Sequence, residues 1–352
     1  MGSPVKLRNV QALRAYGAFA VAYYHTGFSL GIGLGLPIGS FGVAIFFVIS
    51  GFIMAMVCDT DSRHFLGRRI ARIVPLYWIL TLAVYLIASI APGLLGSTSV
   101  GWNSLVRSLF FIPYQNRGTY FPILFLGWSL NYEMYFYVLI AAALWISKRH
   151  APLIASGAMI AILLTLQVLQ PGGAMMFYGH PIILLFVIGI LLYYAFQAIP
   201  SERILANKWT LIITGIAAAL VMIITAINLI EWRNALIVGF TSSVLVFCAV
   251  LLDKANVSFR WPFLMLLGDA SYAMYLVHPY CEEAINKFVA RSISILNSKT
   301  LVGMPISLAV TILASILVYR WLDNPLHIYF RNLFARKPKL PAVSPVAHPV
   351  SE

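Results

Sequence analysis

The sequence predicts an all-α, polytopic integral membrane protein with about ten transmembrane helices and both termini in the cytoplasm. Of its 352 residues, 61% are hydrophobic and 10% are charged. A soluble core of this length cannot bury so much apolar surface, so lipid must cover much of it. Apolar runs of roughly 17 to 22 residues, long enough to cross a bilayer, predict spans at 10–30, 39–58, 71–91, 127–146, 151–169, 181–197, 210–228, 235–252, 262–281 and 301–320.

The basic residues predict the orientation. A net charge of +13 would suggest a nucleic-acid partner in a soluble protein, but here Lys and Arg fall on alternate connections, as membrane topology requires. With both termini inside, the cytoplasmic segments hold seventeen of the 24 Lys and Arg residues, the outer segments hold six, and Arg14 lies within a span. The positive-inside rule therefore predicts a cytoplasmic N-terminus, and no nucleic-acid partner is expected.

Three other regions complete the predicted organisation. The connection 92–126 contains "VRSLFFIPYQ", which is too short to span and is expected to lie in the interface or to re-enter the membrane. The tail 336–352 is rich in proline and poor in large apolar residues, so we expect a disordered cytoplasmic end. The three cysteines form no CxxC pair, so neither a disulfide framework nor a metal site is expected.

Two ionisable residues, Arg14 and His25, interrupt the first predicted span, "NVQALRAYGAFAVAYYHTG". A helix places them on one face, about 20° apart in azimuth and about 16 Å apart along the axis. The orientation puts Arg14 near the cytoplasmic boundary and His25 toward the outer half of the membrane. Such groups are unfavourable in lipid and mark cavities or functional paths. The alternative is an arginine that extends to the headgroups and a histidine that bonds a neighbouring carbonyl.

A second cluster, Arg68, Arg69 and Arg72, lies at the cytoplasmic start of the third span, in "FLGRRIARIVPLYW". Arg69 and Arg72 share a helix face because they are three residues apart. Guanidinium groups bind phosphate oxygens in a bidentate, charge-assisted way, so the cluster is a candidate phosphate site. Arginines that only set orientation or bind lipid headgroups are the alternative.

The fourth span opens with "GWSLNYEMYFYVL", where Glu133 is the only carboxylate well inside any of the first eight predicted spans. A buried carboxylate must be paired or protonated. Glu133 can therefore be a partner that raises the basicity of His25, an acceptor for a bound hydroxyl, or a structural link between helices.

The ninth span contains "GDASYAMYLVHPY", where Ser271, Tyr275 and His278 recur at helical spacing and share one face. A polar stripe of this kind either lines a site or holds helices together.

These features together resemble the membrane acyltransferase-3 family. Its pattern has an arginine and a histidine in the first helix, as in Arg14 and His25, an RxxR motif at the third, as in Arg69 and Arg72, and an aromatic-flanked acidic helix start, here at Glu133. The resemblance extends from about residue 7 to 335. The stretches "GVAIFFVISGFIM", "FFIPYQN" and "GDASYAMYLVHP" are similar to the branch that acetylates bacterial exopolysaccharides, the succinoglycan-type enzymes.

The resemblance implies a membrane acyltransferase domain over 1–335. Its expected reaction moves an acetyl group from cytosolic acetyl-CoA to a hydroxyl of an exopolysaccharide or its lipid-linked precursor, in the inner membrane of a bacterium. His25 is the expected general base, with Arg14 and Glu133 as further catalytic residues. Coenzyme A carries several phosphate groups, so Arg68, Arg69 and Arg72 are expected to bind it, and no metal is needed.

The acceptor is expected to be a glycan, with membrane lipid and the polysaccharide assembly machinery as further partners. The candidate substrate-binding residues are Trp128, Asn131, Tyr275 and His278. Two departures from the family pattern stand out: this sequence lacks the esterase-like domain that many members carry after the last helix, and "WLDNPL" has Asp323 where many relatives have a glutamate.

Two other classes of function remain open at this point. A glycan or lipid transporter, or flippase, also displays intramembrane Arg, His and Glu, although the two halves lack paired Gly/Pro-interrupted helices. A structural subunit of an export complex would tolerate replacement of Arg14, His25 and Glu133. For an enzyme, the acetyl group either passes directly in a shared cavity or is relayed on a covalent acyl-histidine.

Overall fold

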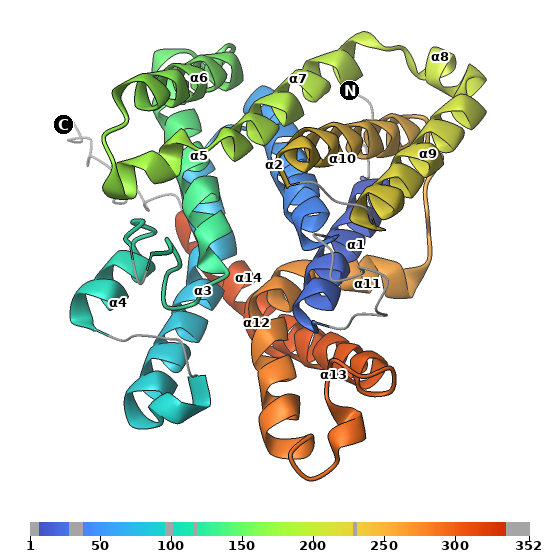
Figure 1. Ribbon diagram of the computed structural model, residues 1–352. Helices are drawn as coiled ribbons and strands as arrows, with labels where there is room; N and C mark the ends of the chain where they lie inside the picture. Colours follow the sequence, from blue (N-terminus) through green and yellow to red (C-terminus); the bar gives the residue numbers. More distant parts are fainter. Residues whose placement is uncertain (1–6, 28–37, 96–100, 116–117, 228–230, 336–352) are drawn as a thin grey trace, which may run out of the picture.

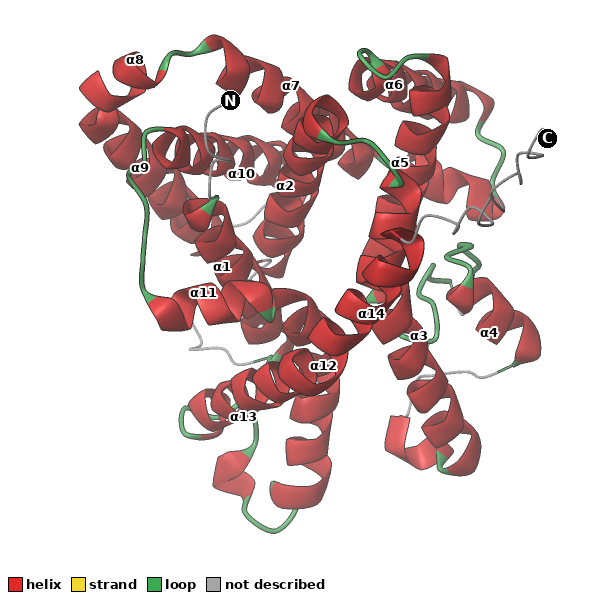
Figure 2. Ribbon diagram, turned by 180° about the vertical axis from the view of Figure 1, so that it is seen from behind, coloured by secondary structure: helices red, strands yellow, loops and turns green. Residues whose placement is uncertain are grey.

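The computed structural model describes residues 7–27, 38–95, 101–115, 118–227 and 231–335, and these are helical with no strand (Figures 1 and 2). The predicted all-α fold is confirmed. Seven helical stretches of the described chain are long and apolar enough to cross a membrane: Gly39–Thr60, Phe65–Ile90, Gly127–Ile146, Ala151–Leu169, Gly173–Ala198, Leu236–Lys254 and Gly303–Phe334. The count of ten and the orientation of the termini stay predictions, and the expected disordered tail lies outside the described residues.

Most of the predicted spans correspond to an α-helix of the structure. Up to α7 they are α1 (Arg8–His25), α2 (Ile38–Thr60), α3 (Phe65–Ile90), α4 (Trp102–Leu109), α5 (Gly127–Ile146), α6 (Ala151–Leu169) and α7 (Leu184–Ala198). The later ones are α8 (Ser201–Ala206), α9 (Lys208–Ile227), α10 (Glu231–Lys254), α11 (Pro262–Asp269), α12 (Ser271–Ala284), α13 (Gly303–Val318) and α14 (Asn324–Ala335).

Close packing holds α1 against α2 in the centre of the molecule. A Cβ atom added to Gly42 would lie 2.4 Å from the carbonyl oxygen of Gly17, so the two backbones meet where neither helix has a side chain. Small residues at such crossings let membrane helices approach closely. On the other side of α2, the ring of Phe47 stacks on Phe186 of α7 at 4.5 Å, and Phe186 stacks on Phe136 of α5 at 4.6 Å. These contacts tie α1, α2, α5 and α7 into one core.

The predicted ninth span is two helices rather than one. α11 and α12 meet at Ala270, whose ψ of 0° departs from the helical value, so the chain turns there (Figure 1). The turn places Asp269, the last residue of α11, beside α1.

The last predicted span is longer than expected. After α13 the helix continues through a π-helical turn, Tyr319–Asp323, into α14, which packs along α3. The connection 92–126 contains only a 3₁₀ turn, Pro92–Leu95, and α4 among its described residues, in keeping with the prediction that it does not span.

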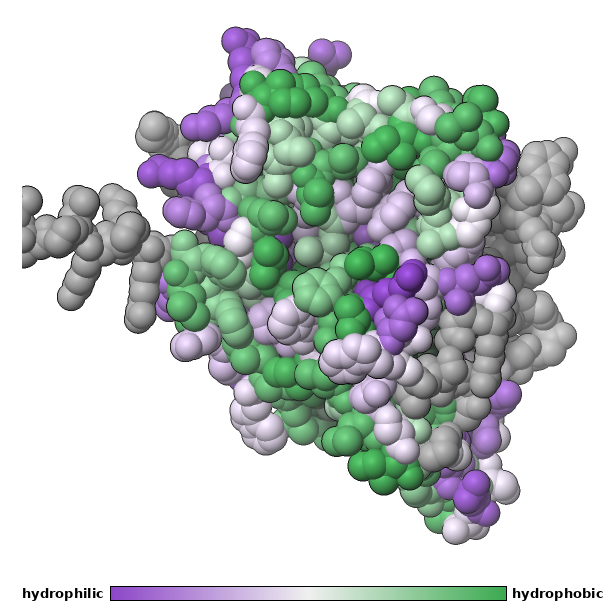
Figure 3. Space-filling model, turned by 90° about the vertical axis from the view of Figure 1, so that its left-hand side faces the viewer, coloured by the Kyte–Doolittle hydropathy of each residue, from purple (hydrophilic) through white to green (hydrophobic). Residues whose placement is uncertain are grey.

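Much of the outer surface is apolar. Figure 3 shows the face formed by the left-hand side of Figure 1, where hydrophobic side chains cover broad areas between hydrophilic patches. Trp145 of α5 is 94% exposed, Val168 of α6 is 82% exposed and Ile90 of α3 is 75% exposed. Such a surface is expected where lipid, rather than water, surrounds the helices.

Candidate active site

A cavity of about 480 Å³ lies between α1, α2, α3, α5, α12 and α14. Six of the ten candidate site residues line it and four do not. Those in the lining are Arg14, Arg68, Arg69, Arg72, Glu133 and Tyr275, whereas His25, His278, Trp128 and Asn131 lie outside it.

The start of α1 is fixed by a carboxylate from α10. Asp253 is 2% exposed and accepts hydrogen bonds from the backbone N–H of Asn9, at 3.0 and 2.9 Å, and from that of Val10, at 3.3 Å. These N–H groups have no partner within the helix, and a negative charge is favourable at a helix N-terminus. The Asn9 amide also donates to the Val257 carbonyl at 2.8 Å. This network sets the height of Arg14 and His25 in the bundle.

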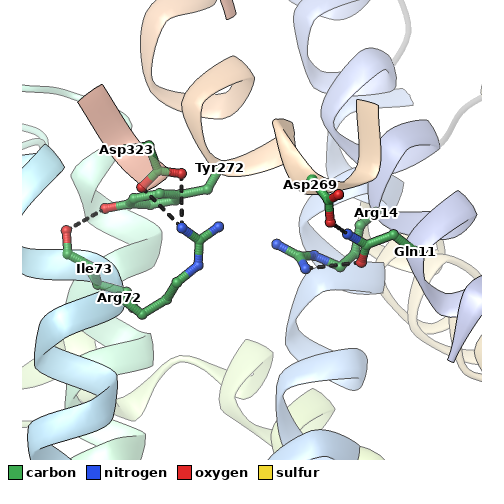
Figure 4. Close-up of polar contacts among 7 residues, drawn as sticks. All are labelled: Gln11, Arg14, Arg72, Ile73, Asp269, Tyr272 and Asp323. Carbon is green, nitrogen blue, oxygen red and sulfur yellow. Dashed lines mark hydrogen bonds and ion pairs between the residues drawn. The ribbon is translucent and has the colours of Figure 1, made fainter. Parts of the chain in front are cut away.

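Arg14 is oriented by a relay from α11. Its guanidinium donates to the side-chain oxygen of Gln11 at 3.1 Å, and the Gln11 amide donates in turn to Asp269 (Figure 4). The bend at Ala270 therefore has a consequence at the site, because it brings the Asp269 carboxylate to α1.

Arg72 is held more directly. Asp323, in the π-helical turn before α14, accepts from one guanidinium nitrogen of Arg72 at 3.0 and 2.8 Å. The guanidinium also lies over the Tyr272 ring, 5.2 Å from its centroid, and the Tyr272 hydroxyl donates to the Ile73 carbonyl at 2.8 Å. Figure 4 shows Arg14 and Arg72 facing each other across the space between α1 and α3. Asp323, in the stretch that departs from the family pattern, thus has a defined contact: it positions Arg72.

The other two arginines of the cluster differ in their partners. Arg68 donates to Asp61 at 2.7 Å, and this hydrogen bond lowers the pKa of the Asp61 carboxyl. The Nε atom of Arg69 is buried and has no hydrogen-bond partner among the described residues.

Glu133 reaches the cavity from α5. The Ser50 hydroxyl of α2 donates to it at 3.2 Å, and the Tyr137 hydroxyl, one turn along α5, also donates to it. Both hydroxyls line the same cavity. These two groups, rather than His25, are the hydrogen-bond partners of Glu133.

His25 lies beside His278 instead. The centroids of the two imidazole rings are 5.1 Å apart, and the Phe125 ring packs edge-on against His25 at 5.6 Å. His278 is fully buried, and its Nδ1 atom is 3.1 Å from the Met274 carbonyl oxygen. Since a carbonyl can only accept, Nδ1 carries the proton, and in the neutral ring Nε2 is an acceptor. Nε2 is buried without a partner in the described part of the chain.

Tyr275 contacts both the cavity and one histidine of the pair. Its ring contributes to the lining and is 6.3 Å from the His278 ring, centroid to centroid. The Tyr275 hydroxyl is hydrogen-bonded to the Ser129 hydroxyl at 2.7 Å. Trp128, in contrast, packs edge-on against Tyr132 at 6.1 Å, and the Oδ1 atom of Asn131 is buried with no partner among the described residues.

Among the lining residues that sequence reasoning missed are Ser50, Tyr137, His327 and Arg331. The last two come from α14, beyond the end of the last predicted span. Their spacing of four residues in "HIYFR" is the available signal, because it places both side chains on one helix face.

The chain is similar to known proteins over most of its length. Residues 7–320 match the Acyl_transf_3 family model, described as an acyltransferase domain. The exopolysaccharide production protein ExoZ of Rhizobium meliloti (strain 1021) is 32% identical over 259 residues, which are 71% of this chain and 78% of the relative. The putative peptidoglycan O-acetyltransferase YrhL of Bacillus subtilis (strain 168) is 25% identical over 309 residues, 76% of this chain and 47% of that relative. No solved structure matches the chain significantly.

Proposed function

The chain belongs to the acyltransferase-3 family of membrane acyltransferases, and from this premise we propose that it moves an acetyl group from cytosolic acetyl-CoA to a hydroxyl of an exopolysaccharide or its lipid-linked precursor. The relative whose name refers to exopolysaccharide production supports this acceptor class. The relative named as a peptidoglycan O-acetyltransferase supports transfer to a glycan oxygen. The proposed location is the inner membrane of a bacterium, where the protein is a multi-pass membrane protein.

The observation that carries the proposal is the cationic cavity. Arg14 and Arg72 come from separate helices and face the same space (Figure 4). Gln11, which is bonded to Asp269, orients Arg14, and Asp323 orients Arg72. A polyanion such as coenzyme A suits such a cavity, because guanidinium groups form charge-assisted hydrogen bonds with phosphate. The positive-inside rule predicts that the Arg68–Arg72 end of α3 faces the cytoplasm, where acetyl-CoA is made.

The proposed chemistry is a direct transfer with His25 as general base. His25 takes the proton of the acceptor hydroxyl as that oxygen bonds to the thioester carbonyl carbon. The C–S bond then breaks, and coenzyme A leaves as a thiol after the thiolate takes the proton from the His25 imidazolium. His278 is a positioning residue, because its free Nε2 can accept a hydrogen bond from the His25 ring and so fix its orientation.

Tyr275 has a defined place in this scheme. The arginines line the cavity, whereas His25 lies outside it, beside His278, whose ring is 6.3 Å from that of Tyr275 in the lining. The acetyl-bearing end of the donor is therefore proposed to pass the Tyr275–Ser129 hydrogen bond to reach the base. The acceptor then approaches His25 from the opposite side, which keeps the two substrates apart until transfer. Glu133, hydrogen-bonded to Ser50 and Tyr137, is proposed to orient the donor arm between these two ends.

The experiment that tests the proposal measures ester acetyl groups on surface polysaccharide by proton NMR, before and after mild alkali. The strains make the wild type, His25→Ala, His150→Ala or no protein, at matched membrane levels. His150 is exposed and lies outside the cavity, so it is the control. The proposal predicts loss of the acetyl signal in the null and His25→Ala strains with polymer yield unchanged. Unchanged acetylation in the null strain contradicts the substrate class, and failure of polymer export would favour a transporter.

A further inference from the structure

The cavity carries more positive charge than the sequence motifs account for. Among the described residues, its lining has one carboxylate, Glu133, against five arginines: Arg14, Arg68, Arg69, Arg72 and Arg331. His327 of α14 lines the same cavity. An excess of this size, in a confined space, is stabilised when an anion binds.

Three of these five arginines already have a side-chain partner. Arg68 pairs with Asp61 at 2.7 Å, and Arg72 pairs with Asp323 at 2.8 Å. Arg14 is held by Gln11. Within the described chain, Arg69 and Arg331 have neither an ion pair nor a side-chain hydrogen bond, and the Arg69 Nε atom is buried as well. A buried, unpaired guanidinium N–H is unfavourable unless an acceptor reaches it.

The contact between α3 and α14 brings the two free arginines into the lining of one cavity. A Cβ atom added to Gly67 would lie 3.1 Å from the Phe334 ring, so α14 rests directly on the start of α3. Arg331 precedes Phe334 by three residues and therefore lies on the same side of α14. Arg69, two residues along α3 from Gly67, lines the same cavity as His327 and Arg331 of α14.

We propose that Arg69, Arg331 and His327 form a phosphate-binding subsite for the acyl donor at the solvent-exposed end of the cavity. This inference deepens the proposed function and rests on it. Arg331 is exposed, whereas Arg14 and Arg72 lie deeper in the same cavity. The subsite therefore binds a phosphate at the nucleotide end of coenzyme A, and the rest of the donor extends inward past Arg72.

Geometry favours the donor over a lipid headgroup as the source of the phosphate. The cavity continues from α14 to Glu133 and Tyr275, between helices, so a phosphate held at its mouth has a linear arm directed inward. A phospholipid held at the same point would need to direct its acyl chains into a lining rich in arginine, which is unfavourable.

The test is the affinity of the full-length protein for coenzyme A, measured by isothermal titration calorimetry in nanodiscs of neutral phosphatidylcholine. The variants are Arg331→Gln, Arg69→Gln and His327→Gln, with Arg320→Gln as the matched control. Arg320 lies in the same C-terminal helical run but is exposed and outside the lining. Each lost hydrogen bond to the phosphate is expected to raise the Kd for coenzyme A about tenfold. Arg331→Gln is also expected to make this Kd less dependent on salt concentration. Arg320→Gln is expected to bind like the wild type.

Three outcomes overturn the inference or its premise, and they are distinguishable. A wild-type Kd in both Arg331→Gln and Arg69→Gln overturns the subsite while leaving the donor assignment intact. A wild type that does not bind coenzyme A overturns the proposed donor itself. In the third outcome, Arg331→Gln binds coenzyme A normally, but added phosphatidylglycerol raises the melting temperature of the wild type and not that of the variant. The phosphate at this site then belongs to a lipid. Recovery of affinity in Arg331→Lys supports a charge-based contact rather than a structural one.

Discussion

The imidazole rings of His25 and His278 lie side by side, with centroids 5.1 Å apart, although they come from α1 and α12. Because the Met274 carbonyl fixes the proton of His278 on Nδ1, the buried Nε2 atom is left as an acceptor beside His25. A base whose ring is held by a hydrogen-bond acceptor is the arrangement that orients histidine in serine hydrolases, where a carboxylate has that role. In the proposed mechanism, the Nε2 atom of His278 has that role when it accepts a hydrogen bond from the His25 ring.

Replacing the two histidines is expected to have unequal effects. His25→Ala removes the base and should lower the transfer rate by about 10²- to 10⁴-fold. His278→Ala removes the acceptor that is proposed to orient the His25 ring, and should lower the rate by about tenfold. Both should leave the Kd for coenzyme A unchanged, since neither residue lines the cavity. Steady-state rates and binding measured on the same preparations check this; a His278→Ala variant with a raised Kd and a normal kcat would contradict it.

Asp323→Asn should free Arg72. The carboxylate is 2% exposed and its bonds to Arg72 are charge-assisted, so the loss should cost about 2 kcal/mol of stability and raise the KM for acetyl-CoA more than it lowers kcat. Asp323→Glu keeps the charge and should restore most of the affinity. Thermal melts and KM values for acetyl-CoA, measured on Asp323→Asn and Asp323→Glu, test this prediction. An Asp323→Asn enzyme with unchanged KM would show that Arg72 does not need this partner.

Glu133→Gln should separate donor binding from transfer. The glutamate is the one carboxylate in the described lining, so its neutralisation should tighten coenzyme A binding several-fold by removing a repulsion. Transfer should fall, because the amide is a poorer partner for the Ser50 and Tyr137 hydroxyls. The Kd for coenzyme A, measured by calorimetry, and the kcat, measured in parallel, test both predicted changes. A Kd higher than that of the wild type would contradict the account.

Gly42→Ala should disturb the α1–α2 contact. The new Cβ would lie 2.4 Å from the Gly17 carbonyl oxygen, so α1 must shift, at a cost of about 1 to 3 kcal/mol. Activity should fall with stability, because α1 carries Arg14 and His25. The control is Gly157→Ala in α6, whose Cβ would meet nothing within 4 Å and should be neutral or slightly stabilising. A lower melting temperature for the control, or an unchanged one for Gly42→Ala, would contradict this reading.

Helical periodicity placed Arg14 with His25, and Tyr275 with His278, on shared helix faces, but only Arg14 and Tyr275 line the cavity. Arg14, Arg72 and Glu133 were each identified from one segment alone, and the structure brings them to one lining. Hydropathy predicted the helices that carry these residues, but not how those helices pack on one another.

The partners of these residues were not predictable in the same way. Arg72 and Asp323 are 251 residues apart, and Asn9 and Asp253 are 244 apart. No local pattern encodes such pairs, because they depend on how α3 packs on α14 and α1 on α10. His327 and Arg331 were missed for a related reason: the hydropathy of the last span ends near residue 320, but the helix continues through the π-helical turn into α14.

The central claim is that the arginine-lined cavity takes acetyl-CoA from the cytoplasmic side and that His25 completes the transfer. The most direct measurement supplies radiolabelled acetyl-CoA to sealed membrane vesicles of both orientations and follows alkali-labile label in their glycans. The account predicts label in inside-out vesicles, little in right-side-out vesicles, and none in either when His25→Ala or Arg72→Gln replaces the wild type. Equal labelling by the His25→Ala protein, or labelling only of right-side-out vesicles, would contradict it.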